Sequence, residues 1–225
     1  MSELLFLVQG EKSFDELTKA GFEIQYIVGT SEFFELRPFL LNKYTGVYLS
    51  TEKELSSLGS FSSNNAVIAV VKQKKNAEII PKPDEFILVL DDIRDPGNLG
   101  TILRTADWFG IRTIIASETT ADLYNPKVIN ASMGSFTRVT VYYTSLSDYF
   151  TKHPMPLYVS DLEGQNLHST DQFAPGAIVL GNESKGVGDW WKALPAHKIR
   201  IPGGSSTESL NVGVSCGILL DRIIH

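Results

Sequence analysis

The sequence predicts an α/β fold built around a parallel sheet, and two observations support this prediction. Short apolar runs alternate with amphipathic stretches along the 225 residues, as they do where strands alternate with helices. In the later part of the chain, apolar runs such as 86–90 are continuous, which is typical of parallel strands covered on both faces.

A change in composition at residues 72–85 predicts two domains joined by a linker. This segment has three lysines within residues 72–75, two prolines and no helical periodicity. Lysines in such a segment more often belong to a solvated tether than to a binding patch. We therefore expect a small α/β domain at residues 1–71, a linker at 72–85 and a larger domain at 86–225.

The expected elements of the first domain are bounded by capping residues. Ser13 is a candidate N-cap and Gly21 a candidate terminator for the first helix, while Thr51 and Glu54 form a capping-box pattern. The strands are expected at 4–10, 24–29 and 65–71, and the helices at 14–22 and 51–58.

The second domain shows the same alternation more clearly. The strands are expected at 86–90, 112–117, 156–161, 177–182 and 197–203, and the helices at 98–110 and 209–224. Ligands of such parallel sheets bind in the loops beyond the carboxyl ends of the strands. Functional residues are therefore expected in those loops.

Charge and composition exclude several classes of protein. The net charge of −6 and the pI of about 5.3 count against nucleic-acid binding by charge alone. The charge is −3 both in residues 1–85 and in residues 86–225, so any phosphate-binding surface must be local. No run approaches 18 apolar residues and the N-terminus lacks a secretory pattern, so no membrane partner is expected. A single cysteine, Cys216, fits a reducing cytoplasm.

Three segments that follow strands are rich in glycine, asparagine and serine, and they are candidates for a binding crevice. They are residues 91–107, 181–188 and 201–211. Each could be an ordinary tight turn, but three on one sheet edge favour a ligand site.

Standard nucleotide, metal and nucleophile patterns are missing. The dinucleotide-binding GxGxxG pattern is absent, and in 181–188 Val187 and Gly188 replace the lysine and the serine or threonine of a P-loop. The four histidines show no metal-ligand spacing, so we expect no metal. Cys216 lies in an apolar pattern and is expected to be a core residue.

Taken together, the three segments resemble the SpoU (TrmH-type) RNA 2′-O-ribose methyltransferases of the SPOUT superfamily. The first motif follows Asp95-Pro96 and runs from Asn98 to Arg104; the second is Gly181-Asn182-Glu183 with Gly186; the third is Ile201-Pro202 followed by Ser209-Leu210-Asn211-Val212. The resemblance covers about 140 residues in the same order and spacing. It implies S-adenosylmethionine as the methyl donor, a tRNA or rRNA substrate with rRNA favoured, a C-terminal SPOUT domain with a deep trefoil knot, and a homodimer.

The resemblance also implies roles for individual residues. Arg104 would be the catalytic residue that activates or orients the ribose hydroxyl, and Glu183 would orient Arg104 or that hydroxyl. Asn98 and Asn211 would brace the loops and contact the substrate. Ser209 belongs to the same catalytic set. Two of these residues also have a purely structural interpretation: Ser209 as the N-cap of the last helix, and Glu183 as an acidic residue at a helix N-terminus. The backbones at Leu180, Gly181, Ile201 and Leu210 would hold the cofactor.

The third motif departs from the family pattern, because Gly203 and Ser205 replace the usual methionine and glycine. Residues 1–71 resemble the small substrate-binding domain often attached to this family. A dimer would bring four arginines to one RNA-binding cleft: Arg94, Arg104, Arg112 and Arg138. Two alternatives stand beside the methyltransferase: a catalytically inactive RNA-binding relative with the same fold, and a nucleotide-utilising enzyme of the doubly wound class.

Overall fold

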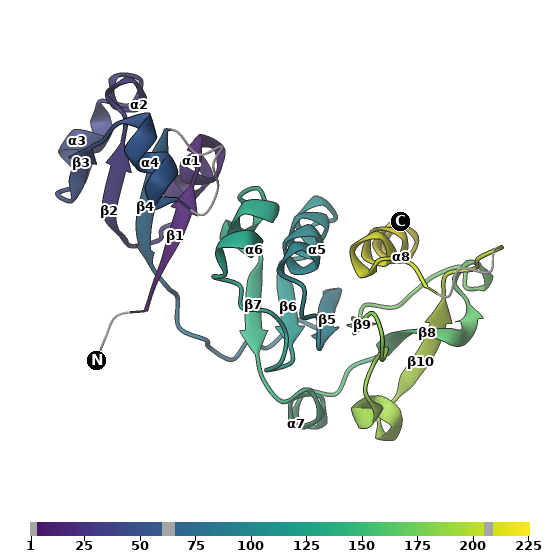
Figure 1. Ribbon diagram of the computed structural model, residues 1–225. Helices are drawn as coiled ribbons and strands as arrows, with labels where there is room; N and C mark the ends of the chain where they lie inside the picture. The colour runs from purple at the N-terminus through teal and green to yellow at the C-terminus, as the bar shows by residue number, and fades with distance from the viewer. Residues whose placement is uncertain (1–3, 60–65, 205–208) are drawn as a thin grey trace.

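The computed structural model describes residues 4–59, 66–204 and 209–225 and contains two β-sheets (Figure 1). A four-stranded sheet lies in the N-terminal part of the chain, and a six-stranded sheet lies in the C-terminal part. No helix in the described residues is both long enough and apolar enough to cross a membrane.

The N-terminal sheet is mixed and has the strand order β1-β4-β2-β3. Strand β4 pairs antiparallel with β1 and β2, whereas β2 and β3 are parallel. The elements are β1 (Leu5–Gln9), α1 (Glu11–Lys19), β2 (Ile24–Gly29), α2 (Ser31–Glu35), α3 (Phe39–Lys43), β3 (Val47–Leu49), α4 (Glu52–Leu58) and β4 (Val67–Lys72).

The C-terminal sheet is entirely parallel and has the order β10-β8-β9-β5-β6-β7. Its strands are β5 (Ile87–Asp91), β6 (Thr113–Ala116), β7 (Thr140–Tyr143), β8 (Leu157–Asn166), β9 (Ala177–Gly181) and β10 (Ala196–Arg200). Its helices are α5 (Pro96–Trp108), α6 (Pro126–Ala131), α7 (Leu146–Lys152) and α8 (Val212–Ile224), with 3-10 turns η1 (Ser135–Thr137), η2 (Leu167–Ser169) and η3 (Asp189–Ala193).

Helices cover both faces of this sheet, which explains its continuous apolar strands. Successive side chains of β5 point to opposite faces, so Leu88 and Leu90 join the core beneath α5 and α8, while Ile87 and Val89 join a second core with α7. Figure 1 shows α5, α6 and α8 on one side of the sheet and α7 on the other. The predicted parallel α/β fold is confirmed in this part of the chain.

The differences from the sequence prediction concern short elements and helix starts. Helices α2, α3, α6 and α7 and strands β3 and β7 were not predicted, because helices of five to seven residues are too short to show a periodic pattern. The first helix begins at Glu11 with Gly10 as its N-cap, so Ser13 lies inside the helix and is buried. The predicted capping box of Thr51 and Glu54 is present at α4.

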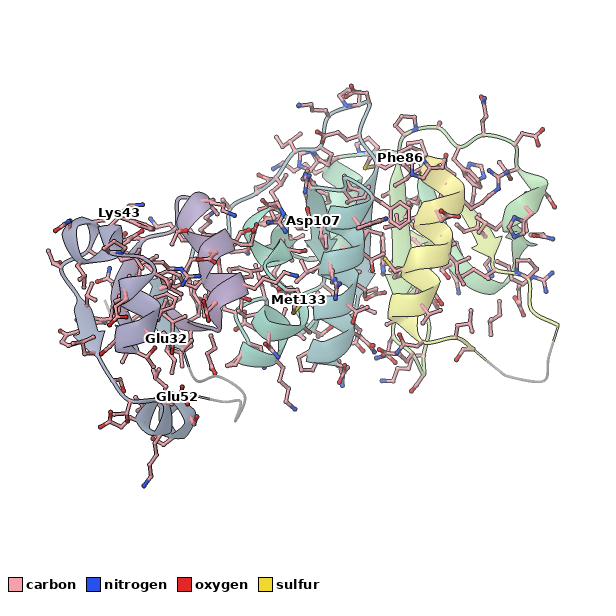
Figure 2. The ribbon with its side chains drawn as sticks, turned by 90° about the horizontal axis from the view of Figure 1, so that it is seen from above. Glu32, Lys43, Glu52, Phe86, Asp107 and Met133 are labelled. Atoms are coloured by element: carbon pink, nitrogen blue, oxygen red, sulfur yellow. The ribbon has the colours of Figure 1, made fainter. Side chains whose placement is uncertain are left out.

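The N-terminal sheet docks against the α6–η1 region through aromatic side chains. Phe6 packs on Tyr124 with ring centroids 4.6 Å apart and on Phe136 at 6.1 Å, and Phe22 also contacts Phe136. Arg138 forms ion pairs with Glu16 of α1 and with Asp107 of α5. Figure 2, seen from above, shows the N-terminal helices beside this region.

The segment between the sheets is held against the protein, contrary to the expectation of a solvated tether. Asn76 donates to the Tyr143 carbonyl at 2.8 Å and accepts from its backbone N–H at 2.9 Å, which covers the free edge of β7. The Tyr149 hydroxyl donates to the Ile79 carbonyl, and Lys74 stands 4.0 Å above the Phe22 ring. The linker is therefore anchored at several points.

Candidate functional site

The candidate site lies where the strand order of the parallel sheet reverses. After β5 the chain places β6 and then β7 on one side of it. The later strands β8, β9 and β10 all lie on the other side, with β9 next to β5. Asp91 at the end of β5 is the register partner of Gly181 at the end of β9, so the first two candidate loops begin side by side. A crevice at such a reversal is the expected ligand site of an open parallel sheet.

The first loop is shaped by backbone strain and a helix cap. Asp92 has a φ of 60°, which is uncommon for a residue with a side chain, and its N–H donates to the Ser117 hydroxyl at 2.9 Å. Arg94 donates to Asp92 at 2.8 Å, and this hydrogen bond lowers the pKa of the Asp92 carboxyl. Asp95 then caps α5 by accepting from the N–H of Asn98 at 2.8 Å, with Pro96 in the first turn.

A chain of hydrogen bonds joins all three candidate loops through Asn98. The Asn98 Nδ2 donates to Glu183 Oε1 at 2.6 Å, and Asn98 Oδ1 accepts from Asn211 Nδ2 at 2.9 Å. These partners are 85 and 113 residues away along the chain. The predicted convergence of Asn98, Glu183 and Asn211 is therefore confirmed as geometry.

The second loop is a tight turn pinned to the first. Asn182 and Gly186 exchange backbone hydrogen bonds of 3.0 and 2.8 Å, and Gly186 has a φ of 69°, which favours glycine. The Asn182 side chain donates to the Asp92 carbonyl at 3.0 Å. A Cβ on Gly181 would lie 2.3 Å from the Gly186 carbonyl carbon, so only glycine allows this turn to close.

Asp91 anchors the remainder of the second loop and was missed in the sequence. One oxygen of its carboxylate, Oδ2, accepts from the Gly188 N–H at 2.7 Å and from Trp190 Nε1 at 2.9 Å. The Trp190 ring also stacks on Phe150 of α7 at 5.5 Å. The sequence offers one indication of this role, an aspartate at the end of an apolar strand. That pattern does not show that its partners are Gly188 and Trp190, about a hundred residues later.

The second and third loops line a cleft of about 940 Å³ with β8 and α8. All four residues predicted to hold a cofactor line this cleft: Leu180, Gly181, Ile201 and Leu210. Glu183 and Ser209 also line it, and Lys185 and Arg200 provide positive charge. The volume falls within the usual range for a small-molecule site, about 300–1,000 Å³.

Arg104 does not line this cleft. It lies on the exposed side of α5 and has no hydrogen bond or ion pair with the described residues. Arg104 comes six positions after Asn98, which corresponds to about 9 Å along a helix and more than a quarter of a turn around its axis. Glu183 is hydrogen-bonded to Asn98 instead. The predicted orientation of Arg104 by Glu183 is therefore not found within one chain.

Several expectations about single residues are corrected. Asn211 caps α8 by accepting from the Gly213 N–H at 2.9 Å, so Ser209 is not the N-cap and the helix starts at Val212. Glu183 lies in a turn rather than at a helix N-terminus. Gly203 is described and exposed, whereas Ser205 lies outside the described residues.

The other two arginines of the predicted RNA cleft are neutralised, and the cysteine is inert. Arg112 pairs with Asp107, and Arg138 pairs with Asp107 and Glu16, so neither is available as a free positive charge.

Burial raises the pKa of the Cys216 thiol to about 12, which excludes a thiolate nucleophile at neutral pH. Among the described residues, no group of three or more His, Cys, Asp or Glu side chains could hold a metal ion.

Known proteins resemble this chain over most of its length. The model of the SpoU rRNA Methylase family matches residues 85–221, the range that contains the hydrogen-bonded group around Asn98. An uncharacterized tRNA/rRNA methyltransferase of Borreliella burgdorferi is 34% identical over 164 residues, covering 70% of this chain and 68% of that protein. The 23S rRNA (guanosine(2553)-2'-O)-methyltransferase RlmP of Bacillus subtilis is 26% identical and covers 96% of this chain and 86% of its own length. The crystal structure of an AdoMet-bound rRNA methyltransferase from Sinorhizobium meliloti has a TM-score of 0.84 at 27% identity, covering 97% and 86% of the two chains.

Proposed function

Because this chain belongs to the SpoU rRNA methylase family, we propose that it methylates a ribose 2′-hydroxyl of ribosomal RNA in the cytoplasm, with S-adenosylmethionine as the methyl donor. The observation that carries the proposal is the hydrogen-bonded group of Asn98, Glu183 and Asn211 at the edge of the 940 Å³ cleft. It unites the three family motifs at one place. The polar side chains that an inactive relative could lose are all present.

The cleft fits the methyl donor by its chemistry. Leu180, Ile201 and Leu210 offer apolar surface for an adenine ring, and backbone groups beside them can bind its ring nitrogens. Lys185 and Arg200 also line the cleft and can bind a carboxylate. Asp161 and Glu163 line it too, and both pair with Lys198, at 2.9 and 3.6 Å. When bound, S-adenosylmethionine supplies a methyl group already activated by its sulfonium charge.

The side chains around the cleft divide the remaining work. One Glu183 oxygen binds Asn98, and Oε2 has no partner among the described residues, so Oε2 can accept a hydrogen bond from a ribose hydroxyl. Arg104 is a donor that stays charged, and it orients the hydroxyl and an adjacent phosphate. Asn98 holds Glu183 at the substrate, and Ser209 borders the same space.

A homodimer completes this arrangement. Trp108 is 86% exposed on the same side of α5 as Arg104, and Val214 of α8 is 53% exposed. Helices α5 and α8 lie side by side in Figure 2. A second copy that covers these apolar side chains would bring Arg104 of one chain towards a cleft outside its own subunit.

Two finer features of the fold belong to the same proposal. Strand β10 pairs on the far side of β8, but the following helix α8 returns to pack on β9 and α5, a path that supports a deep trefoil knot. Residues 1–71 form a small RNA substrate-binding domain, residues 72–85 the linker and residues 86–225 the methyltransferase domain. The separate four-stranded sheet of the N-terminal part supports this division.

The test is a comparison of ribosomal RNA from cells with and without this protein. Mapping of 2′-O-methyl groups is expected to show one site that disappears with the gene. The purified protein is expected to restore that mark on the unmethylated RNA when S-adenosylmethionine is added. An unchanged methylation map together with no binding of S-adenosylmethionine in calorimetry would overturn the proposal.

A further inference from the structure

One face of the N-terminal sheet is only partly covered. Side chains alternate along each strand, and the register places Phe6, Val8, Ile27, Ala69 and Val71 on the face that packs against α1, α2 and α3 in the large core. The opposite face includes Leu7, Val28 and Val70, which are half-buried. Helix α4 has seven residues and buries one side chain, Leu55, so it cannot cover this face alone.

Two tyrosines stand on the open part of this face. Tyr26 of β2 is 45% exposed and Tyr48 of β3 is 55% exposed, and their ring centroids are 6.1 Å apart with planes inclined by 49°. Tyr48 is the register partner of Val28, two residues from Tyr26, so both rings rise from neighbouring strands on the same side. Neither hydroxyl has a hydrogen-bond partner among the described residues.

The local backbone is arranged to place Tyr26 there. The register of β2 against β4 shifts between Ile24 and Tyr26, and such a bulge changes the side of the sheet to which a side chain points. Gly46 lies directly against this bulge, because a Cβ on Gly46 would come within 2.3 Å of the Gln25 carbonyl and 2.9 Å of the Tyr26 ring. The Gly46 carbonyl then accepts from the Ile27 N–H at 2.7 Å, which seats β3 beside β2.

We propose that Tyr26 and Tyr48 form a stacking platform for two unpaired bases of the RNA substrate. Exposed aromatic rings on neighbouring strands of a sheet hold single-stranded RNA by stacking on the bases, and phenol hydroxyls can bind base edges or ribose. This inference rests on the proposed function, which supplies the RNA, and it specifies unpaired nucleotides as the part of the substrate bound here.

Charge supports stacking over phosphate binding as the main contribution of this face. Residues 1–71 carry more acidic than basic side chains, and Lys72, which shares the face, is held 3.5 Å from Glu23. Affinity at the platform is therefore expected to depend on the rings and to change little with salt, because salt weakens contacts with phosphates.

The experiment measures binding of fluorescein-labelled oligouridine and oligoadenosine strands of about 12 nucleotides, and of a duplex of equal length, by fluorescence anisotropy. The full-length protein is compared with the double variants Tyr26→Ala/Tyr48→Ala and Tyr26→Phe/Tyr48→Phe. The control is Phe39→Ala, which removes a ring with 56% exposure from α3. Binding of S-adenosylmethionine and methylation of ribosomal RNA are measured in parallel.

The platform predicts that single strands bind more tightly than the duplex. The alanine pair is expected to lower single-strand affinity at least about tenfold, and the phenylalanine pair and Phe39→Ala are expected to stay within about twofold of the wild type. All variants should bind S-adenosylmethionine normally. Ultraviolet crosslinking of oligouridine should attach RNA to Tyr26 or Tyr48 in the wild type.

Two results would overturn the platform. One is an alanine pair that binds single strands and methylates ribosomal RNA as well as the wild type does. The other is an alanine pair that separates into monomers in sedimentation while the wild type is a dimer, since a second copy of the chain would then cover this face. A wild-type protein that fails to methylate any RNA would instead contradict the proposed function.

Discussion

The two sheets of this molecule differ in how completely they are covered. The parallel sheet has helices on both faces, and hydrogen bonds from Asn98 to Glu183 and Asn211 tie its three candidate loops together. The mixed sheet is covered well on one face and leaves Tyr26 and Tyr48 exposed on the other. Under the proposed function, this difference would place the fixed chemistry on one framework and an adaptable RNA contact on the other, since catalysis needs rigid geometry and the recognition of varied RNA shapes does not.

The largest effect is expected for Arg104→Ala, a change on helix α5, which packs on the parallel sheet. We expect methyl transfer to fall by about 10³-fold, because a charged donor near the reacting hydroxyl is lost. Binding of S-adenosylmethionine should be unchanged, because Arg104 does not line the cleft. Steady-state transfer assays and calorimetry measure the two effects. Arg112→Ala, which removes an arginine paired with Asp107, is the matched control, and near wild-type transfer by Arg104→Ala would refute the assignment.

Asn98→Ala tests whether the loops act as one rigid unit. Both halves of the Asn98 amide are used, so its loss frees Glu183 and Asn211 together, and we expect transfer to fall by about 100-fold. Asn125→Ala is the control, because Asn125 caps α6 at the same sheet edge without joining the group. Equal activities of these two variants would show that the hydrogen-bonded group is not needed.

Asp91→Asn separates positioning of the cleft from chemistry. The neutral amide oxygen accepts more weakly than the charged carboxylate, so the bonds from the Gly188 N–H and Trp190 Nε1 are weakened and the second loop loosens. Affinity for S-adenosylmethionine is expected to fall by about tenfold, with a smaller change in kcat at saturation. Asp189→Asn changes an exposed aspartate in the same segment and should have no effect. A fall in kcat alone would contradict a positioning role.

Trp108→Ser tests the proposed dimer, which would bring Arg104 to a cleft outside its own subunit. Removing a large exposed ring from the proposed interface is expected to raise the dimer dissociation constant by about 10–100-fold while leaving the monomer folded. Analytical ultracentrifugation measures this dissociation constant directly. Leu58→Ser, which changes a side chain that is 63% exposed on α4, should leave association unchanged. A monomeric wild type would remove this part of the proposal.

Thr51→Ala is the mildest perturbation and affects only the mixed sheet. Loss of the capping box at α4 is expected to cost about 1 kcal/mol of stability, measured by chemical denaturation. Methyl transfer by the folded enzyme should not change, because α4 lies outside the cleft. A loss of transfer comparable with that of Asn98→Ala would mean that the two frameworks are coupled.

Features with a local signal were predictable from the sequence, and those that depend on distant partners were not. Strand β2 was predicted with its observed bounds. The motif residues Leu180, Gly181, Ile201 and Leu210 all line one cleft, while their contact with the cofactor stays a prediction. The start of α8 was wrong because Ser209 and Asn211 are both good capping residues, and Asn211 is additionally held by Asn98, which no local pattern shows. The role of Asp91 was missed for the same reason.

The anchored linker determines how this protein can be cut into working pieces. A fragment starting at residue 86 would lose Asn76, which covers β7, and the Ile79 carbonyl that receives the Tyr149 hydroxyl. Its outermost strand would then be open to pairing with other chains, inviting precipitation. A C-terminal half that is to be studied by itself should therefore retain residues 73–85, and fluorescent labels or tags belong outside the stretch 74–79.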